Sequence, residues 1–228
     1  VLFRSPAVLG ADPQRLDAIE AFVELHVEQG RGLIDLNAAV AIGTAIMPHG
    51  RWRFDFGGQP NHAGTTRMAD RRDPMTAFAH FVLAAQANAA ARDEPGRAAR
   101  ATVGKVRCTP GAVNAIPSAV IGWLDARAAD EGTLDSLLAG IGNDVRAQWP
   151  YDITITEESR TPAQAFDPSL SLAVREILGD VPLLDTGAGH DAGILADAGV
   201  PSAMLFVRNP TGISHSPEEY AEDADCET

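Results

Sequence analysis

The order of its strand-like and helix-like segments constrains the fold of this chain more than any other feature. Residues 51–56 alternate in the manner of a strand and stop at two glycines, and an alanine-rich helical stretch over 73–92 has Pro74 near its start. Two further strands, a helix and a last strand follow, at residues 100–107, 119–127, 133–148 and 151–157. This order predicts a ferredoxin-like α+β domain over residues 50–160, with four antiparallel strands and two helices on one face.

The sequence on both sides of that domain is typical of an α/β fold. Helical spacing covers residues 12–21, 169–178 and 192–198, and strand-like runs cover residues 22–28, 38–47, 182–184 and 202–207. We therefore expect one α/β domain, made of residues 1–49 and 161–228, that is interrupted by an inserted domain of about a hundred residues, a normal domain size.

Composition and charge exclude several classes of function. The 228 residues carry a net charge of -13, which argues against nucleic acid or an anionic membrane surface as a partner. No apolar run reaches the roughly 18 residues needed to cross a membrane. The two cysteines, Cys108 and Cys226, are too few for a disulfide framework and suit a reducing compartment, so we expect a cytoplasmic protein. The chain begins without an initiator methionine, and we expect a fragment cut at both ends.

The histidines divide into two groups. Four lie in short, polar segments bordered by glycine, which is typical of functional loops on a rigid scaffold: His26, His62, His190 and His215. The other two have ordinary settings. His80 lies on the long apolar helix, where we expect a packing role, and His49 lies in a turn that favours solvent exposure.

His26 stands near the end of a strand-like segment with carboxylates at alternate positions. One face of this segment carries Glu24, His26 and Glu28, and the other, which we expect to be the core face, carries Val23, Leu25 and Val27. An imidazole beside carboxylates suits a divalent metal, and a carboxylate can also orient the ring. A half-buried strand histidine bonded to a carboxylate is an equally good interpretation of the local sequence.

The remaining candidates are polar groups in loops and at strand ends. His215 follows the apolar strand 202–207, where sheet ends of α/β folds face the ligand crevice, although an exposed loop histidine fits equally well. His62 lies in a loop before the long helix, where hydroxyl and amide groups form a ready anion or oxyanion site. Asn114 lies in a turn and Arg127 at a strand end. An arginine there can grip a carboxylate with two hydrogen bonds or form an ordinary salt bridge.

Six segments of the sequence together resemble the amidohydrolases of the M20 metallopeptidase superfamily. In chain order they are ELHVEQG (24–30), GGQPNHAGTTRM (57–68), VNAIP (113–117), LDAR (124–127), GAGHDA (187–192) and GISHSPEE (212–219). They are most similar to the branch that holds N-carbamoyl-L-amino-acid hydrolase, allantoate amidohydrolase and β-ureidopropionase-type enzymes. The resemblance implies a zinc-exopeptidase-like α/β catalytic domain, here partial, with the inserted α+β domain as its dimerisation or lid domain.

The resemblance also implies roles for individual residues. His26 and His215 match ligands of two divalent metal ions, zinc or manganese. His62 matches a catalytic histidine that contacts the substrate and polarises the scissile carbonyl, typically from the neighbouring subunit of a homodimer formed through the inserted domain. Positions that contact a small-molecule carboxylate substrate, the first two by holding its carboxylate, are matched by Asn114, Arg127, Gln29 and Gly189.

The implied reaction is the metal-dependent hydrolysis of linear amide C–N bonds in N-carbamoyl or ureido carboxylates. Alternatives are an aminoacylase or exopeptidase of the same superfamily, which would cleave acyl or peptidyl amides, and a noncatalytic dimerisation module that has shed its catalytic half. The HAGTT and GAGHDA forms favour the ureido branch.

Two departures from the family pattern bear on these expectations. Arg67 stands where many relatives have a proline, which concerns fine specificity. The family's HxD segment and Glu-Glu pair lie upstream of the ELH segment, and only 25 residues precede His26 here. The bridging Asp, one His ligand, one Glu ligand and the catalytic Glu are therefore missing from this sequence. We expect the chain by itself to bind metal weakly and to turn over no substrate.

Overall fold

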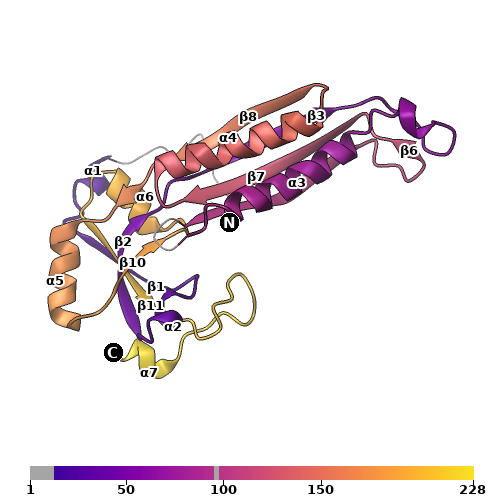
Figure 1. The fold of residues 1–228 in the computed structure, drawn as a ribbon. Coiled ribbons are helices and arrows are strands. Elements are labelled where there is room, and N and C mark those ends of the chain that lie inside the picture. The colour runs from indigo at the N-terminus through magenta and orange to yellow at the C-terminus, as the bar shows by residue number, and fades with distance from the viewer. Residues whose placement is uncertain (1–12, 95–97) are drawn as a thin grey trace, which may run out of the picture. The chain divides into compact units, whose positions relative to one another are not determined.

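The protein consists of two compact units. The computed structural model describes residues 13–94 and 98–228. Unit 1 contains Val1–Ile46 and Gln164–Thr228, and unit 2 contains the intervening Met47–Ala163. Each unit has a sheet and a hydrophobic core of its own (Figure 1). Among the described residues, no helix is long and apolar enough to cross a membrane.

Unit 2 contains a four-stranded antiparallel sheet with strand order β5-β7-β3-β8. The strands are β3 (His49–Gly57), β5 (Ala99–Thr109), β7 (Ala119–Ala128) and β8 (Ile153–Thr161). The two long helices are α3 (Pro74–Ala90) and α4 (Glu131–Gln148), which lie side by side along one face of the sheet (Figure 1). The predicted order of strands and helices over this segment, and its antiparallel sheet, are therefore confirmed.

Local sequence signals explain where the two helices of unit 2 begin. The Asp73 carboxylate accepts a hydrogen bond from the backbone N of Met75 at 3.0 Å, and Pro74 occupies the first turn of α3. The Asp130 carboxylate accepts one from the backbone N of Thr133 at 2.8 Å and starts α4 in the same way. Alternate residues of β3 and β7 then point toward the helices and form a core rich in phenyl rings.

Unit 1 contains a mixed sheet with strand order β1-β11-β2-β10. Its strands are β1 (Phe22–Val27), β2 (Val40–Ile46), β10 (Leu183–Thr186), β11 (Ser202–Val207) and the short β9 (Gln164–Ala165), which pairs with β2. Its helices are α1 (Pro13–Leu16), α2 (Gly32–Asp35), α5 (Pro168–Leu178), α6 (Asp191–Asp197) and α7 (Asp223–Cys226). β1 runs parallel to β11, and β11 runs antiparallel to β2.

Three details of the sequence interpretation are wrong. The helix expected over residues 12–21 is only the four-residue α1, and residue 12 lies outside the described part of the chain. His80 is exposed on α3 rather than packed. The apolar face of β1 is not its core face, because Val23 is 45% and Leu25 is 62% exposed.

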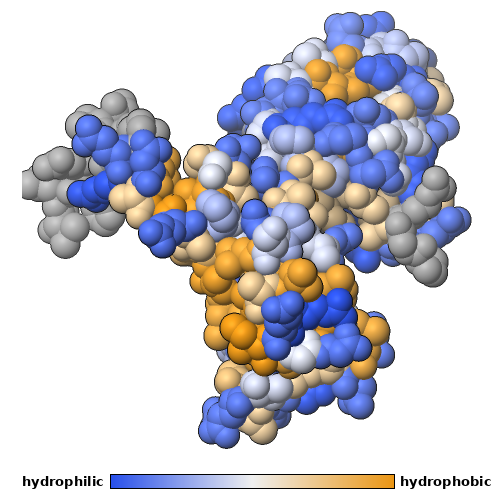
Figure 2. All heavy atoms as spheres, turned by 90° about the vertical axis from the view of Figure 1, so that its left-hand side faces the viewer, coloured by the Kyte–Doolittle hydropathy of each residue, from blue (hydrophilic) through white to orange (hydrophobic). Residues whose placement is uncertain are grey.

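The parallel register of β1 and β11 explains why the polar face of β1, and not its apolar face, lies on the core side of the sheet. Glu24 lies opposite Met204, and His26 lies opposite Phe206, so the polar side chains share a face with two buried core residues. Val23 and Leu25 therefore point to the other side of the sheet. Figure 2 shows apolar surface gathered over unit 1, on the face of the molecule drawn there.

Candidate metal centre

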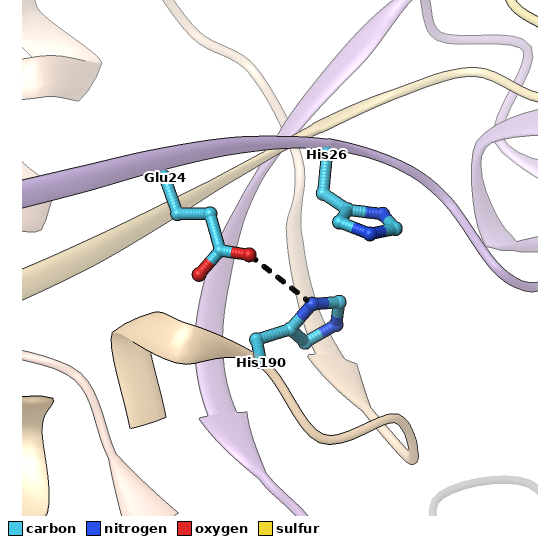
Figure 3. A group of neighbouring side chains, drawn as sticks. All are labelled: Glu24, His26 and His190. Carbon is cyan, nitrogen blue, oxygen red and sulfur yellow. Dashed lines mark ion pairs between the residues drawn. The ribbon is translucent and has the colours of Figure 1, made fainter. Parts of the chain in front are cut away.

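Three side chains of unit 1 form a group that could hold a metal ion. Glu24 and His26 project from the same face of β1, and His190 stands immediately before α6. Each offers a ligand atom, and these atoms all lie within 4.8 Å of one another (Figure 3). Imidazole nitrogen and carboxylate oxygen are a common ligand set for zinc and suit other divalent transition metals.

The imidazole of His26 has one nitrogen bound and one available. Its Nδ1 lies 2.7 Å from the carbonyl oxygen of Val27, so Nδ1 carries the proton and donates it. Metal-binding histidines commonly hold their second nitrogen in this way, because the hydrogen bond fixes the tautomer and the ring orientation. Nε2 of the half-buried ring has no hydrogen-bond partner among the residues that the structure describes, and it is the atom suited to an ion.

His190 is more deeply buried than His26, with a side chain only 2% exposed. Its Nδ1 lies 3.7 Å from Oε1 of Glu24, and its Nε2 lies 3.5 Å from Oγ1 of Thr186. Burial is the main cause that lowers the pKa of His190 below its ordinary value, and the neighbouring His26 lowers it further, while Glu24 opposes both. Burial therefore favours the neutral form of the ring.

The carboxylates of Glu24, on β1, and of Glu28, directly after β1, accept hydrogen bonds from different elements. Oε2 of Glu24 accepts a hydrogen bond from the backbone N of Ala192 at 2.6 Å, so Glu24 connects β1 to the first turn of α6. The Glu28 carboxylate accepts hydrogen bonds from the backbone N of Gly32 at 2.6 Å and of Leu33 at 2.8 Å. Glu28 thus organises the start of α2.

The loop that carries His215 packs against the end of β1. A Cβ atom on Gly212 would lie 3.3 Å from the carbonyl oxygen of Gly30 and 2.7 Å from a side-chain carbon of Arg31, so only glycine allows this approach. Gly212 also has a positive φ of 65°, which glycine adopts without strain. The segment with His215 is therefore in contact with the segment that follows His26.

A hydrogen-bond network centred on Glu219 makes the same connection. The Glu219 carboxylate accepts a hydrogen bond from the backbone N of His215 at 2.8 Å. That bond is the largest cause that lowers the pKa of Glu219 below its ordinary value, and hydrogen bonds from Ser214 and Gln29 lower it further. The exposed ring of His215 is not part of the group formed by Glu24, His26 and His190.

Gln29 and the glycine-rich loop before α6 meet at a small cavity. The cavity has a volume of about 100 Å³, and its lining includes Gln29, Thr186 and Gly187. Gly189 is exposed, and a Cβ atom added to it would meet nothing within 4 Å. The loop therefore leaves open space beside Gly189, next to a cavity lined partly by Gln29.

In unit 2 the structure brings His62 and Asn114 together. His62 belongs to β4 (Asn61–His62), which pairs with β6 (Ala115–Ile116), and the backbone N of Ala63 donates to the carbonyl oxygen of Asn114 at 3.0 Å. Nδ1 of the exposed His62 accepts hydrogen bonds from the backbone N of Gly64 at 3.0 Å and of Thr65 at 3.2 Å. Nδ1 is therefore unprotonated, and Nε2 carries the ring proton.

Arg127 does not join that pair, although the sequence led us to expect all three residues on one surface cluster. It lies near the far end of β7, opposite His49 of β3, and its Nε forms an ion pair with Asp125 at 2.8 Å. The two-stranded sheet of β4 and β6 adjoins the other end of β7, near Ala119. The strand between Ala119 and Arg127 extends over roughly 27 Å at the usual rise per residue, which is why the cluster is split.

His190 is the residue of this centre that sequence reasoning left without a role. Its visible signal was weak, because only the histidine itself and the glycine-rich turn before a helix could be recognised. The contacts of His190 with Glu24 and His26 depend on how α6 packs on β1, which the local sequence does not show.

Comparisons with known proteins agree on one family. The model of peptidase family M20/M25/M40 matches residues 5–228. An allantoate amidohydrolase from Escherichia coli is 34% identical over 209 residues, which cover 88% of this chain and 50% of that protein. An N-carbamoyl-L-amino acid amidohydrolase from Geobacillus stearothermophilus is 34% identical over 235 residues, which cover 95% of this chain and 55% of that protein.

A solved structure shows the same likeness. A crystal structure of an amidase of the hydantoinase/carbamoylase family from Burkholderia vietnamiensis matches with a TM-score of 0.81 and 30% identity, over 91% of this chain and 51% of that one. The chain therefore spans about half the length of the relatives it matches.

Proposed function

The chain belongs to peptidase family M20/M25/M40, and from this premise we propose that the protein carrying it is a metal-dependent amidohydrolase. Its proposed substrates are N-carbamoyl or ureido carboxylates, such as N-carbamoyl-L-amino acids or allantoate, in which it hydrolyses a linear amide C–N bond. The names of the relatives in E. coli and G. stearothermophilus support this substrate class.

The single observation that carries the proposal is the state of the His26 imidazole. Its Nδ1 donates to the Val27 carbonyl oxygen, so Nε2 is the ring nitrogen that is available to bind a divalent cation. We propose that His26 holds one of two zinc or manganese ions and that His215 holds the other. When bound, such ions lower the pKa of a water molecule and polarise a substrate carbonyl.

The chemistry of His62 suits stabilisation of a developing oxyanion. Because two backbone N–H groups donate to Nδ1, the ring proton is held on Nε2, which makes Nε2 a hydrogen-bond donor on an exposed side chain. We propose that the Nε2–H group donates a hydrogen bond to the scissile carbonyl oxygen, with Asn114 as a neighbouring substrate contact. Gln29 and Gly189 are proposed contacts from unit 1.

Arg127 is the proposed anchor for the substrate carboxylate. Its side chain is 30% exposed and forms an ion pair with Asp125, which presents it in one orientation. Since Arg127 and His62 lie at opposite ends of β7, one copy of unit 2 does not supply both to one small substrate. We propose a homodimer formed through unit 2, in which His62 and Asn114 of one copy act with Arg127 of the other.

The test of the metal assignment is a calorimetric titration of the chain with Zn²⁺ and Mn²⁺. His26→Ala should weaken binding at least about ten-fold, since it removes a ligand. His80→Ala is the matched control, because His80 is exposed on α3 and takes no part in the proposed site. Equal affinities for the wild-type chain and His26→Ala would overturn the assignment.

A further inference from the structure

We propose that Glu24 and His190 are positioning residues for His26, and that His190 is not itself a metal ligand. This inference rests on the proposed role of His26 in metal binding. All three side chains offer atoms within 4.8 Å of one another, so proximity alone does not separate a ligand from a supporting group. The hydrogen-bond partners of each ring nitrogen distinguish a metal ligand from a supporting group.

Both ring nitrogens of His190 face protein groups. Nδ1 is directed at Oε1 of Glu24, 3.7 Å away (Figure 3), and Nε2 at Oγ1 of Thr186, 3.5 Å away. Oγ1 of Thr186 also accepts a hydrogen bond from the backbone N of Ala188 at 3.0 Å, which fixes its place in the loop. With its side chain 2% exposed, His190 has no nitrogen turned to open space.

Glu24 is occupied in the same way. Its Oε2 accepts the hydrogen bond from Ala192 in the first turn of α6, and its Oε1 faces His190. The carboxylate therefore joins β1, His190 and α6 into one rigid arrangement. A Glu24 that turned toward an ion would give up the backbone N–H of Ala192.

The ring of His26 rests on this arrangement. The His26 and His190 rings meet edge to face, with centroids 4.8 Å apart and an interplanar angle of 70°. His190 also packs against the buried Phe206 ring, with centroids 5.8 Å apart. Because Phe206 and Glu24 hold His190, the His26 ring cannot turn toward α6, and its Nε2 keeps one direction.

Two variants of His190 separate positioning from ligation. His190→Phe keeps an aromatic edge beside His26 but has no nitrogen, whereas His190→Ala removes both. Partners that orient a metal-binding ring typically change metal affinity by about ten- to a hundred-fold. We expect His190→Ala to weaken Zn²⁺ binding by about that factor and His190→Phe to restore most of the loss, as measured by calorimetry on the chain.

Two variants of Glu24 test the connection to α6. Glu24→Gln keeps an oxygen that can accept from Ala192, whereas Glu24→Ala does not. We expect faster amide hydrogen exchange at Ala192 and weaker Zn²⁺ binding in Glu24→Ala, and near wild-type exchange in Glu24→Gln. Unchanged exchange and affinity in Glu24→Ala would overturn its positioning role.

The outcomes also distinguish this inference from the proposed function. Equal losses of Zn²⁺ affinity in His190→Phe and His190→Ala, with one fewer imidazole around the ion by X-ray absorption, would show that His190 is a ligand and would overturn the inference. Wild-type affinity in both variants would make it an ordinary core histidine, which also overturns it. Binding that survives His26→Ala would instead reject the metal assignment on which the inference rests.

Discussion

Replacing Phe81 by alanine should lower the free energy of unfolding of unit 2 by several kcal/mol and leave the stability of unit 1 unchanged. Phe81 is fully buried at the centre of the unit 2 core. Its ring stacks on Phe54 with centroids 4.1 Å apart and lies 5.7 Å from Phe56. A Cβ atom on Gly122 would come within 2.9 Å of the Phe81 ring, so the ring packs directly on the backbone of β7.

The magnitude follows from this packing. Removing a buried phenyl ring typically costs about 3–5 kcal/mol, which combines the lost transfer free energy with the cavity left behind. The neighbours of Phe81 belong to β3, β7 and α3, and a β-sheet cannot collapse readily into such a cavity, so we expect about 4 kcal/mol. With a urea dependence of about 2 kcal/mol per M, the midpoint should fall by roughly 2 M.

Tryptophan fluorescence is a selective assay for this effect. The three tryptophans of the protein are Trp52, Trp123 and Trp149, and all lie within Met47–Ala163. Fluorescence during urea titration therefore reports the unfolding of unit 2, while far-ultraviolet circular dichroism reports both units. A shift of the fluorescence midpoint by less than about 0.5 M would refute the packing argument.

Phe166→Ala is the matched control for Phe81→Ala. Phe166 is 4% exposed in the core of unit 1, so the same ring is removed from the other unit. It should lower the urea midpoint at which unit 1 unfolds, as seen by circular dichroism, and leave the midpoint of the tryptophan fluorescence transition near its wild-type value. Equal shifts of the tryptophan transition in both variants would show that the two units unfold together.

Three further substitutions have expected outcomes. Asp225→Ala should cost unit 1 about 2 kcal/mol by circular dichroism during urea titration, because Asp225 is 6% exposed and accepts two hydrogen bonds from Arg208, at 2.9 and 2.8 Å. Gly43→Ala should cost about 1–3 kcal/mol in the same assay, because its Cβ would lie 2.7 Å from that of Met204; an unchanged midpoint would contradict the close approach. In an intact homologue, replacing the arginine equivalent to Arg127 by alanine should raise KM for a carboxylate substrate roughly ten-fold or more with little change in kcat, and a pure loss of kcat would argue against a binding role.

Much of the fold follows from local sequence signals. Asp73 and Asp130 cap the two helices of unit 2, and the strict alternation in β3 and β7 marks their buried faces. These signals act over a few residues, so the order of elements in unit 2 was predictable. The faces of β1 were not, because Val23 and Leu25 show the same alternation whichever side is buried.

The candidate site was predictable only in part, for the same physical reason. His26 and its alternating carboxylates are local in sequence. Glu24 and His190 are far apart in sequence, and they meet only because α6 packs on β1. The separation of Arg127 from His62 depends on the length and direction of β7. Residue types and spacing identified the candidate residues, whereas the contacts between them depend on the tertiary structure.

The most direct test of the proposed function is a substrate panel on a chimera. The half of the E. coli allantoate amidohydrolase that this chain does not match would be joined to this chain and loaded with Zn²⁺ or Mn²⁺. The products of N-carbamoyl-L-amino acids, allantoate, N-acetyl-L-amino acids and dipeptides would be measured by chromatography, with the chain alone and the intact E. coli enzyme as controls. We expect metal-dependent turnover of an N-carbamoyl amino acid or allantoate, with kcat/KM at least about ten-fold above that for the acetyl and peptide substrates. A folded, metal-loaded chimera that prefers acetyl or peptide substrates, or that has no activity where the intact E. coli enzyme is active, would contradict the account.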